Sequence, residues 1–437
     1  MKVKNKRTMR IKRREKPWPK ESIIRLISFI IVGLSTGVIV ASFKKAIGLV
    51  AARIEDLFLK ARGDIKLSLL VILIFILIAS LIYYLSKKNP MINGSGIPII
   101  YGMLDGKFKV DSPRTLLAKF VTSVLAIGSG LTLGREGPSV QIGGLVGDIT
   151  HKLLKSKDDR TYYIGSAAGA GIAVAFNAPI TGLLFTIEEI FQRTNRKVFL
   201  SAGISIFSAV IISDLIFGNN PALMNLPIIK QADFSMIFYI FLLGIVCGLS
   251  GVFFNKIVIG SKGFFAKIKI NPYIKYLLPF IITAIVLLYN IELFSAGEGF
   301  IFLPLGEKSD LSRLVFLYFA KILLLALAFG NSIPGGSLVP LLVIGSLLGN
   351  IFATFLVNIN LIDPSYILYF ALLAMAGHFS AIVRAPITGI ILVFEMSGGV
   401  FSYFLGLSIV SLIAYGTAEV LKSKPFYSHL YELMRKG

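Results

Sequence analysis

The sequence predicts an all-α polytopic membrane protein made of two inverted-topology repeats whose helices are short, tilted and broken. Three observations predict this fold class. The 437 residues are 55% apolar with a mean hydropathy of +0.79, which soluble domains do not reach. Several charge-free stretches are long enough to cross a bilayer core of ~30 Å. Two blocks of sequence also occur twice in the same order.

Membrane-spanning elements are expected where charged residues are missing. The charge-free stretches include 26–43, 67–86, 161–187, 235–255 and 396–418. Residues 322–362 also lack charge but are too long for one span, so Pro334-Gly335-Gly336 is expected to break them into two helices. The 41 glycines and 17 prolines predict that many helices are short or interrupted.

Charge at the two ends predicts the topology. Ten of the first 20 residues are Lys or Arg and one is Glu, and the last 16 residues carry four more basic side chains. By the positive-inside rule both termini are cytoplasmic, and the chain crosses the cell membrane an even number of times. We interpret residues 1–22 as a basic cytoplasmic segment held against anionic lipid rather than bound to nucleic acid. Residues 428–437 form a short cytoplasmic tail.

Metal, cofactor and hydrolytic chemistry find little support. Cys247 is the one cysteine, so no disulfide framework or thiolate cluster can form within one chain, and the three histidines lie far apart. An intramembrane hydrolase with Ser95 or Ser337 as nucleophile would need a nearby base, and the histidines are distant in sequence from both serines. We therefore expect no metal site, no cofactor and no enzyme activity.

Self-comparison reveals an internal repeat. The string APITG occurs at 178–182 and at 385–389, an offset of 207 residues. Residues 118–149 align with 320–351 at an offset of 202, with 12 identities in 32 positions. Two blocks in the same order at nearly the same offset predict two related halves.

The halves are expected to be membrane repeats of 23–225 and 226–427, although the polar region 255–275 is a second place where they could join. Duplicated halves with interrupted helices are typical of transporters whose site lies near the bilayer midplane, between the repeats. The repeats are inverted if each half crosses the membrane an odd number of times.

The repeat aligns GREGP, residues 134–138, with GSLVP, residues 336–340. Both strings have the form Gly-x-x-x-Pro and precede a run that can form a helix, and proline is favoured in the first turn of a helix. Two helix N-termini that face each other would bind an anion without a full positive charge. Such a site also suits rapid passage, because a bound anion must leave again.

Glu136 is the first candidate for a functional residue. A charged side chain deep in a membrane costs ~2.5–3.5 kcal/mol on insertion scales and is a functional hypothesis by default. Next to an anion site, Glu136 would occupy that site when ionised and leave it when protonated, as a gate and a proton carrier. The alternative is a surface-loop carboxylate paired with Arg135.

Glu188 and Glu189 follow the first APITG in a helical run. Neighbours on a helix point ~100° apart, so the two carboxylates have different environments. Glu188 has a counterpart in Glu395, which favours a structural role for that pair. Glu189 aligns with Met396 and is the functional candidate, unless it is a helix-end carboxylate that faces water.

Ser95, in the glycine-rich break NGSGIP (93–98), offers a hydroxyl donor, although this segment could also be an ordinary loop. Lys119 and Lys321 occupy equivalent positions in the repeats. They could raise the local potential for anions, or snorkel to the membrane surface.

Four motifs resemble those of a known family. GSGIP (94–98), GREGP (134–138), PGGSLVP (334–340) and KPFYS (424–428) occur in the order found in the CLC chloride channel and transporter family. The resemblance runs from about residue 25 to 432. It implies two inverted halves and a homodimer with one pathway in each subunit.

The resemblance implies a role for each matched residue. Ser95 resembles the serine that donates to the central chloride, and Tyr427 the tyrosine that closes the inner side of that site. Ser337 and Leu338 would offer backbone amides to the same ion. Because Ser95 and Tyr427 are both present, chloride is favoured over fluoride and nitrate.

Glu136 resembles the external gating glutamate of the family, and the backbone from Arg135 to Gly137 would line the outer anion site. Glu189 resembles the internal proton-transfer glutamate that is associated with exchangers. The resemblance therefore favours exchange of chloride for protons. The alternative is a passive voltage- or pH-gated chloride channel that uses the same pore.

The chain departs from the family pattern in three respects. Leu338 stands where the second anion loop usually has Phe. Relatives often carry acidic residues after GSGIP, but here Ile99, Ile100 and Tyr101 follow, so a proton-path or dimer role for carboxylates is not expected there. Cystathionine-synthase-type domains are missing, and nucleotide control through them is not expected.

Overall fold

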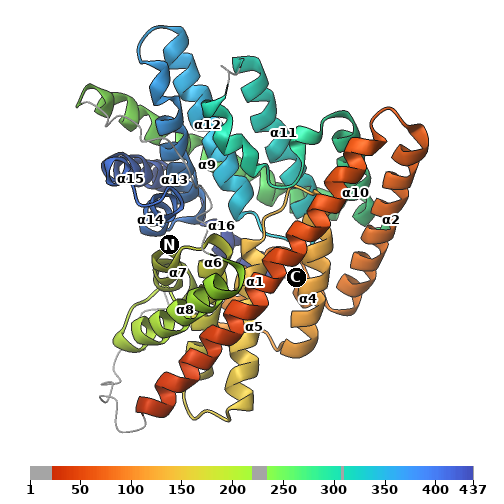
Figure 1. Cartoon of the computed structure of the whole chain (residues 1–437), viewed down its shortest axis with the longest axis vertical. Helices are drawn as coiled ribbons and strands as arrows, with labels where there is room; N and C mark the ends of the chain where they lie inside the picture. The colour runs from red at the N-terminus through yellow and green to blue at the C-terminus, as the bar shows by residue number, and fades with distance from the viewer. Residues whose placement is uncertain (1–21, 219–233, 307–309, 437) are drawn as a thin grey trace, which may run out of the picture.

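The computed structural model describes residues 22–218, 234–306 and 310–436, and these residues form a helical protein (Figure 1). The α-helices of the first half are α1 (Ser22–Ala61), α2 (Ile65–Lys88), α3 (Ile97–Leu104), α4 (Ser112–Gly128), α5 (Glu136–Leu153), α6 (Arg160–Phe176), α7 (Pro179–Phe185) and α8 (Arg196–Phe217). Those of the second half are α9 (Ile237–Lys267), α10 (Pro272–Tyr289), α11 (Leu311–Gly330), α12 (Leu338–Asn358), α13 (Ile367–Val383), α14 (Pro386–Met396), α15 (Phe404–Val420) and α16 (Phe426–Lys436).

Short helical segments join these helices. Six are 3-10 helices: η1 (Pro90–Ile92), η3 (Phe234–Met236), η4 (Ile291–Leu293), η5 (Glu298–Leu305), η6 (Pro364–Tyr366) and η7 (Phe401–Tyr403). The seventh, η2 (Thr186–Ile190), is a π-helical turn that continues α7. Such turns inside helices are frequent at functional sites.

Nine helices in the described part of the chain are long and apolar enough to cross a membrane. The long charge-free stretch 322–362 is divided as predicted, because α11 ends at Gly330 and α12 begins at Leu338, on either side of the Pro-Gly-Gly sequence. The expectation of an all-α, multi-pass membrane protein with broken helices is therefore confirmed.

Local sequence explains where several helices begin and end. The side chain of Asp64 accepts hydrogen bonds from the backbone N–H groups of Lys66 and Leu67, which caps the start of α2. Helix α2 ends at Lys88 and its C-cap residue Asn89 directly precedes Pro90, because the residue before a proline disfavours helical geometry.

The two APITG strings form equivalent helix breaks. Helices α6 and α13 are followed by the C-cap residues Asn177 and Arg384. Both adopt the left-handed conformation, with φ of 54° and 72°. Pro179 and Pro386 then begin α7 and α14 at the first helical position, where a missing N–H is tolerated. These breaks produce short helices, as the glycine and proline content predicted.

Helices of the two halves are packed in equivalent pairs. Helix α5 lies along α6 in the first half, and α12 lies along α13 in the second. Figure 1 shows α5 to α8 in the lower part of the view and α11 to α15 in the upper part. Helix α7 contacts α14 across the boundary between the halves, so the two APITG breaks lie close together.

The predicted boundary between residues 225 and 226 lies outside the described residues, and so do positions 1–21 of the basic N-terminal segment. The alternative boundary region 255–275 lies mostly within α9, which is continuous from Ile237 to Lys267.

Candidate functional site: a buried anion pathway with two glutamates

The two aligned glycine loops meet at the centre of the protein. The N–H of Gly134 donates to the carbonyl of Gly336 at 2.7 Å, and the N–H of Gly336 donates back to Gly134 at 2.6 Å. This antiparallel bridge joins the residues that precede α5 and α12. It brings the N-termini of these two helices together, as the repeat predicted.

The NGSGIP loop joins the same junction. The N–H of Gly94 donates to the carbonyl of Ser332 at 3.0 Å, and the N–H of Gly335 donates to the carbonyl of Gly94 at 3.2 Å. Ser95 is therefore fixed beside the loop that precedes α12. Three loops that are distant in the sequence form one unit through their backbones.

Gly137 allows these loops to approach closely. A Cβ atom at this position would lie 2.5 Å from Oγ of Ser95, 2.6 Å from its carbonyl oxygen and 3.1 Å from Cα of Gly336. Any side chain would push the three loops apart, because such distances are shorter than van der Waals contact. The glycine therefore determines how near the Ser95 hydroxyl lies to the start of α5.

Three hydroxyl groups are buried around this junction. Ser95, Ser337 and Tyr427 are each at most 3% exposed. Their hydroxyl oxygens have no hydrogen-bond partner among the residues that the structure describes, and the Tyr427 hydroxyl lies close to Ser337. Since buried polar groups are normally satisfied, three orphaned hydroxyls together indicate a place for a polar ligand.

Leu338 is the first residue of α12, and Ser337 precedes it as the N-cap. The first N–H groups of a helix have no partner within the helix, so those of α12 can bind an anion. The Leu338 side chain is buried, with 1% exposed, and forms part of the apolar core. An aliphatic side chain thus occupies the position where the resemblance expects Phe.

Glu136 is fully buried at the N-terminus of α5, so the alternative of a surface-loop carboxylate is wrong. Its Oε2 atom accepts a hydrogen bond from the N–H of Val339, in the first turn of α12, at 3.4 Å. Its Oε1 atom has no hydrogen-bond partner in the described chain. The carboxylate therefore lies where the two helix N-termini meet, in a position that suits an anion.

Arg135 connects Glu136 to the outside of the site. Its Nε lies 3.7 Å from Oε1 of Glu136, and its Nη2 lies 3.4 Å from Oε1 of Glu298 at the start of η5. The Glu298 side chain is 51% exposed, whereas that of Glu136 is 0% exposed. Together with Lys44, both Arg135 and Glu298 line a cavity of about 430 Å³. Sequence reasoning missed Glu298, which lies far from GREGP in the chain.

Glu189 lies in the π-helical turn η2 and is 4% exposed, so a helix end facing water is also wrong. Its carboxylate accepts a hydrogen bond from the hydroxyl of Tyr101 in α3. Glu188 points elsewhere and accepts hydrogen bonds from Thr388, which confirms that the two neighbours have different environments.

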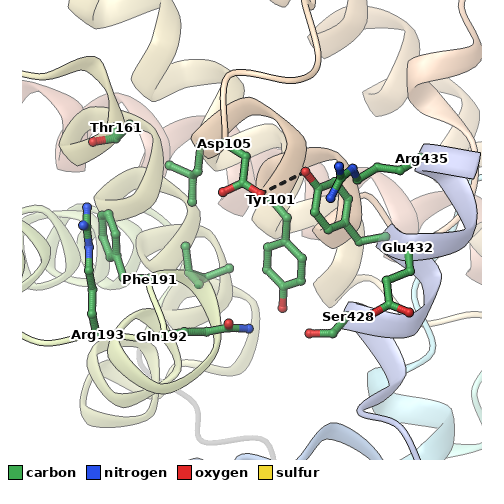
Figure 2. Close-up of a pocket in the computed structure, with 12 residues that line it drawn as sticks. Tyr101, Asp105, Thr161, Phe191, Gln192, Arg193, Ser428, Glu432 and Arg435 are labelled. Carbon is green, nitrogen blue, oxygen red and sulfur yellow. Dashed lines mark hydrogen bonds between the residues drawn. The ribbon is translucent and has the colours of Figure 1, made fainter. Parts of the chain in front are cut away.

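Tyr101 was missed as a functional residue, because it was treated only as a departure from the acidic residues of relatives. It lines a cavity of about 590 Å³ together with residues of α16, including Ser428 and Arg435 (Figure 2). Glu189 itself is not among the residues that line this cavity. The signal in the sequence is the position of Tyr101, three residues after the end of GSGIP.

The two equivalent lysines do not snorkel. The Nζ atom of Lys119 donates to the carbonyls of Ile92 and Gly94 at 2.7 and 2.6 Å. Lys321 is likewise buried and donates to two carbonyls of the loop around residue 294. Lys119 therefore holds the NGSGIP loop in place, and whether it also attracts anions stays a hypothesis.

The family of the chain follows from comparison with known proteins. The family described as "Voltage gated chloride channel" matches residues 75–419, which is more than half of the chain. The chain belongs to the voltage gated chloride channel family. The resemblance seen in the four sequence motifs is thus confirmed, and the family is one of transport proteins rather than enzymes.

Curated members of the voltage gated chloride channel family resemble the chain over most of its length. The H(+)/Cl(-) exchange transporter ClcA of Vibrio campbellii is 34% identical over 414 residues, which cover 92% of this chain and 87% of the relative. The protein of the same name from Citrobacter koseri is 33% identical over 423 residues, covering 94% and 88%.

Solved structures of the same family share the fold. A slow cyanobacterial Cl-/H+ antiporter superposes with a TM-score of 0.87 at 28% identity, covering 96% of this chain and 99% of that one. A CLC-type fluoride/proton antiporter superposes with a TM-score of 0.76 at 21% identity, covering 94% and 98%. The second likeness concerns the fold alone.

Proposed function

We propose that the protein exchanges chloride for protons across the cell membrane, with Glu136 as the gate. One observation carries this proposal: the Glu136 carboxylate is fully buried where α5 and α12 begin, and it accepts a hydrogen bond from Val339. A carboxylate held by helix N-terminal N–H groups occupies the environment that suits a chloride ion.

The same position can serve two anions in turn. When Glu136 is ionised, it competes with chloride for the N–H groups at the start of α12. When a proton neutralises it, the attraction to these N–H groups is lost, and burial no longer penalises a charge. The protonated side chain then leaves the pathway and chloride enters. Each proton carried by Glu136 is thereby linked to the movement of chloride.

The central chloride site lies on the inner side of this gate. Ser95 and Tyr427 supply hydroxyl donors, and Ser337 and Leu338 supply backbone N–H groups. The hydroxyl groups without a partner support this assignment, because a chloride ion can accept several hydrogen bonds from donors that lie in different directions. The N–H groups of Arg135 and Gly137, at the start of α5, face the outer site.

Glu189 would carry protons between Glu136 and the cytoplasm. It is buried, yet its hydrogen-bond partner Tyr101 borders a cavity on the side of the C-terminal helix α16. An ionisable group inside a membrane protein is most often part of an ion or proton path. A passive chloride channel is the second candidate, but a chain that only conducts chloride has no use for Glu189.

Chloride is the favoured anion. The relatives from Vibrio and Citrobacter carry the name of an H(+)/Cl(-) exchanger, and the named cyanobacterial structure is a Cl-/H+ antiporter. The hydroxyls of Ser95 and Tyr427 support the same choice. Fluoride is the competing anion, because a fluoride/proton antiporter has the same fold.

We also propose a topology and an assembly. Residues 23–225 and 226–427 form two inverted repeats, and both termini lie in the cytoplasm. Two chains form a homodimer. The loops that carry Ser95, Glu136 and Ser337 meet within a single chain through backbone hydrogen bonds, which supports one pathway in each subunit. Cross-linking of the purified protein in membranes would give a dimer band, and labelling of tags at both ends would locate the termini.

A flux assay on purified protein in liposomes tests the function. We would impose a chloride gradient, clamp the voltage and follow the internal pH. If chloride flow drives protons uphill, and an equal fluoride gradient does so poorly, the protein is a chloride–proton exchanger. If chloride flows and the internal pH stays constant, the proposal is wrong and the protein is a channel.

A further inference from the structure

Tyr101 is the one described residue whose side chain both hydrogen-bonds to Glu189 and lines a cavity. It lies in the short helix α3, which follows the Ser95 loop directly. The Tyr101 side chain is nearly buried, at 7% exposed, and Glu189 is 4% exposed. The Glu189 carboxylate does not line the cavity, and the Tyr101 side chain contacts both.

The cavity beside Tyr101 is large enough to hold water. Its volume is about 590 Å³, and its lining includes Asp105, Gln192 and Ser428 as polar side chains. Figure 2 shows the Tyr101 side chain pointing away from Asp105, toward the level of Gln192 and Ser428. A polar cavity of this size holds several waters, since one water needs about 30 Å³.

We propose that Tyr101 positions Glu189 and relays protons between this cavity and the Glu189 carboxylate. The proposal rests on the exchange function proposed above. The Tyr101 side chain contacts both the cavity and Glu189, so its hydroxyl offers a polar route for a proton from the cavity to the carboxylate.

A phenol hydroxyl can both donate and accept a hydrogen bond. In the relay, the hydroxyl passes its proton to an ionised Glu189 carboxylate and takes another proton from a cavity water. The O–H bond of Tyr101 is broken and remade, so the phenol ends neutral, Glu189 ends protonated, and the cavity water that gave up its proton is left as hydroxide. The reverse sequence returns a proton from Glu189 to the cavity.

A packing role for Tyr101 is the competing explanation. Its ring meets that of Tyr431 edge to face, with 6.0 Å between ring centroids. The hydroxyl of Tyr431 donates a hydrogen bond to Asp105 at 3.0 Å in the same cavity, whereas the hydroxyl of Tyr101 donates to Glu189. Tyr431→Phe is therefore a matched control, because it removes a phenol oxygen from the same cavity and leaves the hydrogen bond from Tyr101 to Glu189 in place.

The test compares wild type, Y101F, Y431F and Y101A in liposomes, with chloride flux and proton flux measured together. Y101F keeps the ring but removes the relay, so proton flux should fall about tenfold or more while chloride flux falls less. The number of chloride ions moved per proton rises. Y431F should keep the wild-type ratio. In Y101A, cavity water reaches Glu189 directly, so proton flux should exceed that of Y101F.

Each outcome is decisive. If Tyr101 has only a packing role, Y101A should have the lowest proton flux of the variants, and Y101F should keep the wild-type ratio of chloride ions to protons. That result would overturn the relay. If Y101A does not fold, the comparison of Y101F with Y431F still decides, because both are isosteric changes. If wild type itself moves no protons, the proposed exchange function fails before Tyr101 is tested. If wild type exchanges and Y101F keeps its ratio, only the relay fails.

Discussion

Glu188 and Glu395 each bind the start of a short helix in the opposite half of the protein: Glu188 binds α14, and Glu395 binds α7. The Glu188 carboxylate accepts hydrogen bonds from the backbone N–H and the hydroxyl of Thr388, at 2.8 and 2.7 Å. Glu395 accepts the equivalent pair from Thr181, at 2.7 and 2.6 Å. The repeated string APITG and the glutamate after it therefore form one reciprocal clasp between the repeats.

This clasp explains why Glu188 and Glu395 correspond in the repeat while Glu189 does not. A carboxylate near a helix N-terminus satisfies N–H groups that have no partner in the helix. Each glutamate does this for the other half, so both are required. Glu189 is outside the clasp and is free to serve another purpose.

Breaking the clasp should lower stability. We expect Glu188→Gln and Glu395→Gln each to reduce the unfolding free energy by about 1–2 kcal/mol, because hydrogen bonds to a charged acceptor are worth about 1.5–3 kcal/mol and an amide retains part of this. Thermal unfolding in detergent measures the change. The transport rate per folded molecule should stay near wild type.

Glu419→Gln is the control for loss of charge. Glu419 pairs with Arg384 at 3.0 Å, but its side chain is 67% exposed, so the pair contributes little. If the two clasp variants melted at the same temperature as Glu419→Gln, this result would contradict the stabilising role of Glu188 and Glu395.

Removing the carboxylate of Glu136, the proposed gate, should uncouple the chloride flux from the proton flux. In Glu136→Ala, the N–H groups of α12 stay available to chloride at every pH, so chloride should pass at a rate that no longer depends on pH. Proton flux should fall to the level of empty liposomes. Chloride and pH electrodes used on the same liposomes measure both quantities. Persistent uphill proton movement in this variant would remove Glu136 from the mechanism.

The hydroxyl of Ser95 should contribute to chloride affinity. We expect Ser95→Ala to weaken chloride binding about tenfold or more, because a hydrogen bond to a charged group is worth about 1.5–3 kcal/mol. Isothermal titration of the purified protein with chloride measures this. Ser346→Ala is the matched control, because Ser346 is also buried in the described structure without a partner but lies two turns into α12. Equal affinities for the two variants would argue against a chloride at Ser95.

The sequence predicts where these helices begin and end because the residues that break or begin a helix act locally. The break at Pro334-Gly335-Gly336 and the prolines that begin α7 and α14 act through their own backbone geometry. The burial of Glu136 and Glu189 followed from apolar flanks, which a single segment displays.

Pairings between distant segments could not be predicted in the same way. Tyr101 and Glu189 are 88 positions apart, and their hydrogen bond depends on how α3 packs beside η2. The contact of Arg135 with Glu298 depends on how η5 packs against α12 and α13. The repeat contains neither pair, so self-comparison gave no signal for them.

The pairing of Arg135 with Glu298 predicts a change in the pH dependence of transport. Arg135 lies between the exposed Glu298 and the buried Glu136, at 3.4 and 3.7 Å from the two carboxylates. In Glu298→Gln, Arg135 keeps its charge but loses one of two partners, so it favours the ionised, pathway-blocking form of Glu136 more strongly. Removing the negative charge of Glu298 acts in the same direction.

Chloride flux in Glu298→Gln should therefore be activated at a lower pH than in wild type. The displacement should be less than about one pH unit, because Glu298 is half exposed and its interaction is screened by solvent. Flux measured over a pH series, with the same solution on both sides, gives the midpoint. Glu292→Gln is the control, since Glu292 pairs with Arg313 rather than Arg135. A midpoint that stays at the wild-type pH or moves to higher pH would contradict the action of Arg135 on Glu136.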